Sequence, residues 1–115
     1  LPSVVGVVHQ SEASRRLTPQ LVQRLSQIEE PPCVGSDDAN WQPIEGVPYR
    51  LLYENGELIP DQERRAMLTE WSELGRILVD LDAHHRLEDL ARMMGFVDTV
   101  LWCVRPNEID DASGK

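Results

Sequence analysis

The chain has 115 residues, of which 41% are hydrophobic and 27% are charged, and its formal net charge at pH 7 is −9. This composition is typical of one globular domain and excludes a disordered chain, and no apolar run approaches the roughly 20 residues that span a bilayer. The acidic balance argues against nucleic acid and anionic membrane surfaces as partners, because binding to either requires clustered Lys and Arg.

The first third of the chain predicts a strand followed by a helix. Residues 3–8 are a β-branched run with little polar interruption, which is typical of a strand covered on both faces. A helix is expected from about Leu17, with Thr18 as its capping residue and Pro19 in its first turn. It should end before the proline pair 31–32, since proline cannot continue the hydrogen-bond ladder. Its apolar face is expected to contain Leu21, Val22, Leu25 and Ile28.

The middle of the chain predicts less regular structure. Residues 33–35 suggest a very short strand, and 36–47 suggest a loop that holds Trp41 against the body of the domain. Residues 49–53 are expected to form a second strand or an edge strand, which ends at the turn 54–56. The Asn-Gly pair in that turn favours a hairpin, but only two apolar residues remain for a returning strand. A plain turn is therefore the favoured expectation.

The next segment predicts a second amphipathic helix. Asp61 is expected to cap a helix over residues 62–74. Gly75 is expected to end this helix in a left-handed conformation, which glycine adopts without steric cost. The buried face of the helix is expected to contain Ala66, Met67, Trp71 and Leu74.

The last third predicts a parallel strand–helix–strand unit. A central buried strand is expected over residues 77–81, because this run is apolar and β-branched. Asp82 should then cap a helix over 84–94, with Gly95 at the C′ position. A second buried strand is expected over 99–104. The apolar face of the helix is expected to contain Leu87, Leu90, Ala91 and Met94.

The alternation of strands and helices predicts the fold class. Parallel strands need crossover connections whose helices cover both faces of the sheet. We therefore expect an α/β, three-layer Rossmann-like or P-loop-like domain, with a mostly parallel sheet of four or five strands and three helices. Residues 1–109 should form this single domain and 110–115 a flexible polar tail. Because the chain begins without Met, we expect it to be a segment of a longer protein.

The segment after the first strand lacks the residues that grip phosphate. Ligands of open α/β sheets bind beyond the carboxyl ends of the strands. A phosphate-binding loop there needs glycines, so that backbone N–H groups can surround the phosphate, and a lysine that reaches it. Residues 9–16 contain neither glycine nor lysine. Binding of ATP in the usual P-loop manner is therefore not expected.

A cluster of acidic and imidazole side chains follows the central strand. A divalent metal that activates water for hydrolysis could be held by Asp80, Asp82, His84 and His85, with His9 as a further ligand. A structural role is the favoured alternative. Asp82 is placed to cap the next helix, and Asp80 to end its strand as a hydrogen-bonded carboxylate. His84 and His85 would lie in an exposed first helical turn, where adjacent side chains point in different directions.

Other reactive groups give weaker predictions. Ser11 and Ser14 are close to His9 in the sequence, but no Gly-x-Ser-x-Gly turn surrounds them. Cys103 lies inside an apolar strand, which hides a thiol and raises its pKa. Neither Cys33 nor Cys103 belongs to a CxxC pattern, which favours a reducing, cytoplasmic location. We expect the acidic side chains Glu45, Glu54, Glu57, Asp61 and Glu63 to be solvated, and Trp41, Trp71 and Trp102 to anchor the core.

Residues 77–82 and 96–104 carry a resemblance to a known family. A hydrophobic strand that ends in an acidic residue, followed later by an aspartate-containing strand, resembles the second half of ParA/MinD-type P-loop ATPases. The resemblance implies that Asp80 corresponds to the acidic residue on the metal side of that family's site. The family's Gly-rich loop is missing from residues 9–16, so the resemblance implies a degenerate nucleotide site. The chain is also similar to degenerate P-loop-like regions between cyclic-nucleotide-binding modules and patatin-like lipase or transport modules in multidomain bacterial proteins.

These patterns favour a non-catalytic regulatory or protein-interaction module of a larger, multidomain cytoplasmic protein, without a cofactor. Expected partners are other domains of the same polypeptide or another protein, and a homodimer is an alternative. Nucleic acid and direct membrane insertion are not expected. Two alternative functions stay open. One is a metal-dependent hydrolase or metal-binding domain that uses the cluster Asp80, Asp82, His84 and His85, and the other is a small-ligand sensor.

Overall fold

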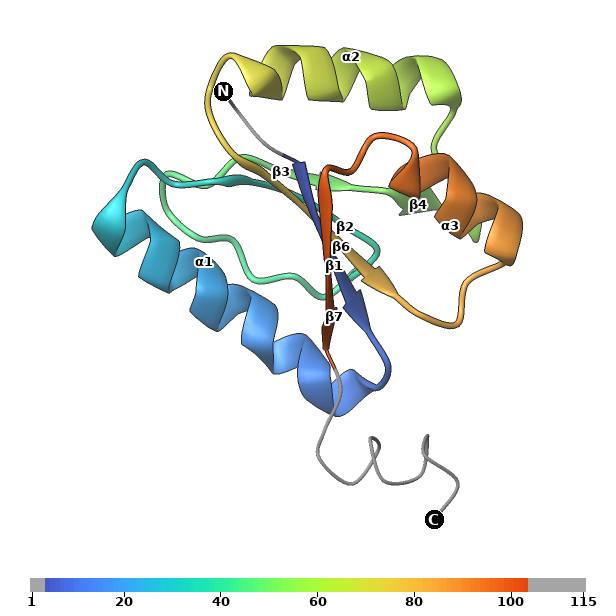
Figure 1. The fold of residues 1–115 in the computed structure, drawn as a ribbon, viewed down its shortest axis with the longest axis horizontal. Helices are drawn as coiled ribbons and strands as arrows, with labels where there is room; N and C mark the ends of the chain where they lie inside the picture. The colour runs from blue at the N-terminus through green and yellow to red at the C-terminus, as the bar shows by residue number, and fades with distance from the viewer. Residues whose placement is uncertain (1–3, 104–115) are drawn as a thin grey trace.

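The computed structural model describes residues 4–103, which form an α/β fold with a five-stranded parallel sheet and three α-helices (Figure 1). The predicted tail at 110–115, and the outermost residues of the first and last predicted strands, lie outside the described residues. In chain order the elements are β1 (Val4–His9), the 3-10 helix η1 (Glu12–Arg16), α1 (Leu17–Ile28), β2 (Cys33–Ser36), β3 (Tyr49–Leu51), β4 (Tyr53–Glu54), β5 (Glu57–Leu58), α2 (Asp61–Ser72), β6 (Ile77–Asp82), α3 (Leu87–Met94) and β7 (Thr99–Cys103).

The main sheet has the strand order β3-β2-β6-β1-β7, and every neighbouring pair in it is parallel. β6 is the middle strand and β1 lies beside it. Both strands are apolar runs, as expected for strands that are covered on both faces. Their register pairs Val4 with Ile77 at one end and His9 with Asp82 at the other. The predicted α/β class with a parallel sheet is confirmed.

Each face of the sheet carries its own apolar core, because successive side chains of a strand point to opposite faces. On one face, Val7, Val34 and Leu78 of the sheet pack against Val22 of α1. α1 therefore covers one face, while α2 and α3 cover the other (Figure 1), as the predicted three layers require. The core beneath α2 and α3 includes Ile77, Val79, Leu81, Met67, Trp71 and Met93.

The crossover connections of β1 and β6 leave in opposite directions along the sheet. The chain passes from β1 through α1 towards the β3 edge, and from β6 through α3 towards the β7 edge. The carboxyl ends of these adjacent strands therefore form a topological switch point, which is where open α/β sheets bind ligands. His9 and Asp82 are the last residues of the two strands and are register partners there.

The predicted caps of α1 and α2 are wrong, because their side-chain oxygens have other partners. α1 begins at Leu17, and the hydroxyl of Thr18 donates to a carboxylate on β6 instead of capping the helix. α2 begins at Asp61 itself. The carboxylate of Asp61 instead accepts hydrogen bonds or ion pairs from Arg64 and Arg65, one turn further along the helix.

The start of α3 also differs from its prediction. The helix begins at Leu87, three residues after the expected start, so His84 and His85 precede it. Asp82 is still part of β6, and its Oδ1 accepts a hydrogen bond from the backbone N–H of His84 at 2.7 Å. This bond closes a turn between strand and helix and holds both histidines at the carboxyl end of the sheet. Gly95 ends α3 with a φ of −62° and not in the predicted left-handed conformation.

The apolar faces of the three helices are predicted correctly only where a helix lies over the sheet. Val22, Met67 and Trp71 are buried, as expected. The predicted face residues Ile28, Ala66, Leu74, Leu87 and Ala91 are exposed. Several of these lie at or beyond a helix end, where no second layer covers them. In their place the buried positions include Arg64 and Met93.

Asn55 and Gly56 form a hairpin turn, so the prediction of a plain turn is wrong. β4 and β5 pair antiparallel across it. The φ angles of Asn55 and Gly56 are 54° and 78°, and two positive values are typical of a type I′ hairpin turn. The short ladder is extended by the backbone N–H of Ile59, which donates to the carbonyl of Leu52 at 2.8 Å. The buried side chains of these two residues fix the hairpin against α2 and the sheet.

β7 is an exposed edge strand, whereas its apolar sequence predicts a buried one. Val100, Leu101 and Trp102 are 46%, 44% and 57% exposed. Trp102 therefore does not anchor the core, while the buried Trp71 does and the half-buried Trp41 stacks on Tyr49. An apolar run predicts a strand but does not say whether that strand lies at the centre or the edge of a sheet.

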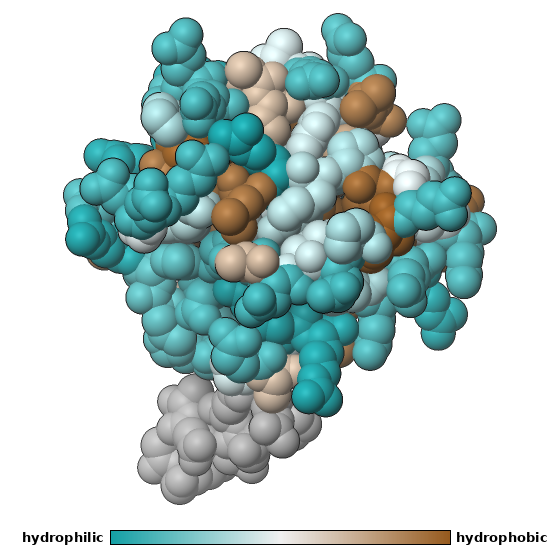
Figure 2. Space-filling model, turned by 180° about the vertical axis from the view of Figure 1, so that it is seen from behind, coloured by the Kyte–Doolittle hydropathy of each residue, from teal (hydrophilic) through white to brown (hydrophobic). Residues whose placement is uncertain are grey.

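The surface is mainly polar. The acidic side chains predicted to be solvated are exposed. On the face drawn in Figure 2, hydrophobic residues form small separate groups among hydrophilic ones, and no broad apolar patch is visible. Within residues 4–103, no helix is both long and apolar enough to cross a membrane.

Candidate functional site

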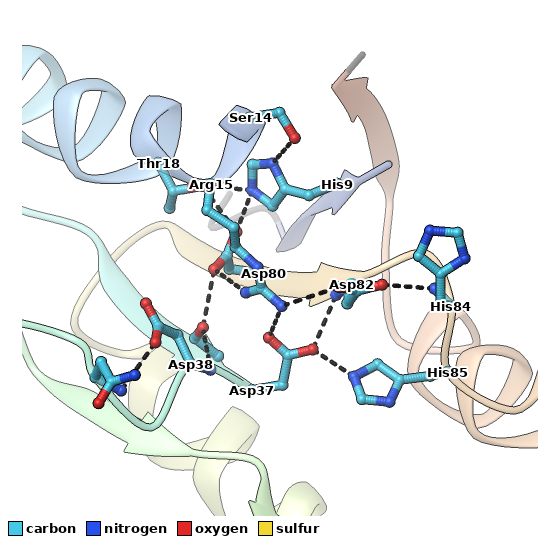
Figure 3. A network of polar contacts seen from close by, with 12 residues as sticks. His9, Ser14, Arg15, Thr18, Asp37, Asp38, Asp80, Asp82, His84 and His85 are labelled. Atoms are coloured by element: carbon cyan, nitrogen blue, oxygen red, sulfur yellow. Dashed lines mark hydrogen bonds and ion pairs between the residues drawn. The ribbon is translucent and has the colours of Figure 1, made fainter. Parts of the chain in front are cut away.

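Polar side chains from three strands meet at the carboxyl end of the sheet (Figure 3). His9 ends β1, Ser36 ends β2, and Asp80 and Asp82 belong to the last part of β6. Asp37 follows β2 directly. The α1 side of this cluster is closed by three side chains of η1 and α1, namely Ser14, Arg15 and Thr18.

Asp80 is the centre of the cluster and is almost fully buried. Its Oδ1 accepts hydrogen bonds from His9 Nε2 at 2.5 Å and from the Thr18 hydroxyl at 2.7 Å. Its Oδ2 accepts from the Ser36 hydroxyl at 2.8 Å and from Arg15 Nη1 at 3.1 Å. Burial alone would raise the pKa of Asp80, but the hydrogen bond and charge of His9, with the two hydroxyl bonds, lower it below 3.8.

Both ring nitrogens of His9 are hydrogen-bonded. Nδ1 lies 3.1 Å from the hydroxyl oxygen of Ser14, which also contacts the carbonyl of Ser11 at 2.8 Å. On the other side the hydroxyl of Thr18 donates to Asp80, and Nε2 donates to the same carboxylate. These contacts hold the imidazole ring against the buried Asp80.

Arg15 joins the ends of β2 and β6. Its guanidinium donates to Asp80 and forms ion pairs with Asp37 and, at 4.0 Å, with Asp82. The side chain is only 12% exposed. Burial would lower the pKa of the guanidinium, but the charges of Asp37 and Asp80 outweigh burial and raise it. A planar cation with several donors suits this position, since it can satisfy carboxylates on two strands at once.

Asp37 links the same cluster to the segment after β6. Besides the pair with Arg15, its Oδ2 accepts a hydrogen bond from the backbone N–H of Asp82 at 2.9 Å and one from His85 Nε2. The ring of His85 stacks on Tyr53, with ring centroids 4.2 Å apart. The position of His85 is thus determined by a carboxylate on one side and an aromatic ring of the hairpin on the other.

The predicted metal ligands lie near one another but do not point to one place. Asp80 faces α1 and is enclosed by donors, and His85 faces Asp37. The ring of His84 points away from Asp37 (Figure 3), and its Nε2 donates to the carbonyl of Gln10 at 2.9 Å. No group of three or more His, Cys, Asp or Glu side chains in residues 4–103 is arranged to hold a metal ion. The metal site stays a prediction to which this geometry adds no support.

A small open hollow lies beside the cluster. Its volume is about 320 Å³. Its walls combine a cation, two carboxylates and two imidazoles, and are formed by Arg15, Asp37, Asp82, His84 and His85. Since these side chains already pair with one another or with backbone carbonyls, the hollow presents few free polar groups to a ligand.

The other predicted reactive groups have structural partners or raised pKa values. Ser14 is buried between Ser11 and His9 and has no access to solvent for a nucleophilic role. Burial raises the pKa of the Cys103 thiol, and the charge of Asp80 adds to this effect. Burial and, to a smaller extent, the charge of Glu70 raise the pKa of the Cys33 thiol. Raised values disfavour the thiolate form in which cysteine reacts.

Sequence reasoning identified only part of this cluster. His9, Asp80 and Asp82 were found because they follow apolar strands. Ser36 and Asp37 follow a strand of only four residues, whose end is hard to place without the structure. The role of Arg15 was missed, and Thr18 was assigned to a helix cap, because their contacts with Asp80 span 65 and 62 positions in the sequence. An arginine after the first strand, beside acidic residues after two others, is the pattern that could have indicated the pairing.

No protein-family model, curated protein or solved structure matches the chain significantly. The function of the cluster therefore has to follow from its own geometry.

Proposed function

We propose that this chain is a non-catalytic regulatory or protein-interaction module of a larger, multidomain cytoplasmic protein, and that its strand ends are a degenerate nucleotide site. The position of Arg15 carries the proposal. Its guanidinium lies between Asp37 and Asp80, beside the switch point at which a ligand would bind. The chain supplies its own cation at the place where a functional site would hold a metal or receive a phosphate.

Charge and backbone geometry both oppose phosphate binding at this place. Asp37, Asp80 and Asp82 put carboxylates at the strand ends, and carboxylates repel phosphate. The segment that would form a phosphate loop is the helical turn η1, which continues directly into α1. One of its N–H groups, that of Ser14, is bonded to the carbonyl of Ser11 at 3.2 Å. Phosphate needs such N–H groups directed outwards.

The buried part of the cluster is unsuited to catalysis. A general acid or base must come within hydrogen-bond reach of the substrate. His9 and Asp80 are 0% and 1% exposed, and each is surrounded by protein donors or acceptors. This network instead joins β1, β2 and β6 to α1. It makes the carboxyl end of the sheet a rigid platform.

A platform whose polar side chains pair with one another suits a domain whose partners are other domains of the same polypeptide or a second protein. The exposed apolar edge at β7 supports this role, because exposed apolar surface often marks a protein contact. Cys33 and Cys103 are free thiols, which supports a reducing compartment such as the cytoplasm.

Thermal unfolding of the purified chain tests this proposal. ATP, ADP and cyclic nucleotides, each with Mg²⁺, are added in turn, followed by Zn²⁺ and Mn²⁺ alone. A ligand at a hundred times its Kd adds about 2.7 kcal/mol of stability, which raises the Tm of a domain of this size by roughly 10 °C or more. We expect no shift with any of them. A saturable rise with a nucleotide overturns the proposal, and one with a metal favours the hydrolase or metal-binding alternative.

A small-ligand sensor is a second candidate, which the hollow beside Arg15 and His85 favours. A ligand there would have to displace the internal ion pairs of Arg15 with Asp37 or of His85 with Asp37. A small dicarboxylate or a guanidinium compound would have the required charge. The same thermal assay with succinate, and with the free amino acid arginine as the guanidinium compound, separates this candidate from the first. Only a sensor would be stabilised by one of these ligands.

A further inference from the structure

The outer edge of β7 is open along the described part of the chain. β7 is the last strand of the sheet, and within residues 4–103 its one strand neighbour is β1. Edge strands of this kind are usually protected by charged residues, proline or a bulge, because their free backbone groups pair readily with other strands. Thr99–Cys103 contains no charged residue and no proline. Its three central side chains, Val100, Leu101 and Trp102, are all large, apolar and exposed.

The backbone register of β7 identifies the groups that are free to pair. The carbonyl of Cys103 accepts a hydrogen bond from the backbone N–H of Gln10 at 3.1 Å, so Cys103 directs its backbone groups towards β1. Because this direction alternates along a strand, Leu101 and Thr99 also face β1. Val100 and Trp102 then direct their N–H and C=O groups outwards, away from the sheet.

We propose that β7 pairs with β7 of a second copy of this chain, antiparallel and about a twofold axis at Leu101. This inference rests on the proposed function and names its interaction surface and partner. In this register Val100 of one copy lies opposite Trp102 of the other, and each of these pairs exchanges both of its hydrogen bonds. Leu101 lies opposite Leu101 in the non-hydrogen-bonded position between them. The outward backbone groups of both copies are satisfied at once.

The side chains are complementary in the same register. Val100 and Trp102 are the register partners of β1 residues on the α3 face, so both side chains lie on that face of the sheet. Leu101 is the register partner of Val7 and lies with it on the α1 face. The twofold axis thus produces two contacts of a β-branched with an aromatic side chain on one face, and one leucine pair on the other. Aromatic and β-branched pairs are among the favourable cross-strand neighbours. A self-complementary surface of this kind is what a closed twofold dimer requires.

Charge and area determine how strong the dimer is. The contact strand is uncharged, but each copy carries a formal net charge of −9. Long-range repulsion between copies is screened at a Debye length of about 10 Å in 0.1 M salt, so added salt should strengthen the dimer. One strand pair buries less than the roughly 1,200 Å² of a standard stable interface. The dimer is therefore reversible and depends on protein concentration.

Analytical ultracentrifugation of the purified chain over a wide concentration range tests the inference. We expect a monomer–dimer equilibrium that shifts towards dimer as salt is raised from low to moderate concentration. Leu101→Lys places two ammonium groups opposite each other at the axis and removes the leucine contact, so it should weaken the dimer by more than about tenfold. The matched control is Leu87→Lys on α3, where the side chain is also exposed, and it should leave the equilibrium unchanged. A chain that stays monomeric throughout overturns the inference, as does a dimer that both variants weaken equally.

A cysteine cross-link tests the register without depending on a charged variant. In a Cys103→Ser background, Leu101→Cys should form an intermolecular disulfide on mild oxidation, because non-hydrogen-bonded partners lie close enough. Thr99→Cys in the same background should not, since the two copies of this residue lie roughly 13 Å apart along the strands. Equal cross-linking of both variants contradicts the register. Failure of these tests leaves the nucleotide and metal results untouched, so the proposed function and its interface are judged separately.

Discussion

Arg15 Nη1 lies 3.1 Å from Asp80 Oδ2, and this contact ties the helical turn after β1 to the end of β6. The same guanidinium pairs with Asp37 after β2. One side chain thus connects three segments at the switch point of the sheet. It also neutralises carboxylates that would otherwise face one another in a mostly buried place. We propose that this side chain both stabilises the strand ends and leaves no place there for a phosphate.

Replacement of Arg15 by alanine is expected to destabilise the fold. Asp37 and Asp80 would lose their shared cation, and breaking a buried ion pair costs about 3 kcal/mol. The free energy of unfolding in urea measures this loss. Arg16→Ala is the matched control, because the neighbouring arginine is exposed, and it should change stability by less than about 0.5 kcal/mol. Equal effects of the two substitutions would contradict the role of Arg15.

The Asp80 carboxylate is expected to stabilise the fold at neutral pH and to lose this contribution towards acid pH. Its folded pKa is lower than the ordinary 3.8, so the unfolded chain binds the proton more readily and stability rises with pH. The contribution is fully present above the ordinary pKa and is lost as the pH falls below it. The difference in unfolding free energy between the wild type and Asp80→Asn should therefore shrink as the pH falls below about 5. A difference that grows towards acid pH would contradict this assignment.

The Nε2 atom of His9 is expected to carry a hydrogen, because it faces the Asp80 carboxylate, which can only accept. Two-dimensional ¹H–¹⁵N NMR that correlates ring carbon protons with both nitrogens reports directly which ring nitrogen carries a hydrogen. His9 Nε2 should have the shift of an N–H group. The exposed His84 provides the comparison within the same spectrum. A bare Nε2 on His9 would show that the assigned direction of its hydrogen bond to Asp80 is wrong.

The hairpin after β3 is expected to depend on glycine at one position. Gly56 has a φ of +78°, and no atom lies within 4 Å of the place that a Cβ would take, so Gly56→Ala adds backbone strain alone. This strain costs about 1 kcal/mol. Gly95 has a φ of −62°, and a Cβ there would meet its nearest atom at 3.6 Å, an ordinary contact. Gly95→Ala should therefore stabilise the protein by about 0.5 kcal/mol through the unfolded chain, and thermal unfolding of both variants checks the contrast.

The strands and helices of this fold are largely predictable because their sequences repeat with the right periods. The apolar runs of β1 and β6 indicated strands covered on both faces, and these are the central strands. β7 has an equally apolar sequence but lies at an edge. Local sequence contains the tendency to form a strand, whereas the number of its neighbours depends on the order of the whole sheet.

The functional cluster was only partly predictable for a related reason. Asp80 and His9 were noticed because both follow apolar strands, and a satisfied carboxylate was the favoured interpretation of Asp80, which its hydrogen bonds confirm. The partners that satisfy it are distant in the sequence. The capping predictions failed for the same reason. Thr18 has a residue type that often caps helices, but α1 begins one residue before it, and its hydroxyl contacts His9 and Asp80 instead.

We propose that the strand-end site is closed by Arg15 and binds no nucleotide. Titration of the ¹⁵N-labelled chain with Mg²⁺–ATP, followed in ¹H–¹⁵N spectra, tests this proposal at the site itself. We predict that the backbone signals of residues 9–16 and the side-chain Nε–H signal of Arg15 stay in place up to millimolar ligand. Saturable shifts confined to these signals and to Asp37 and Asp82 would show a nucleotide bound at the strand ends and would contradict this proposal.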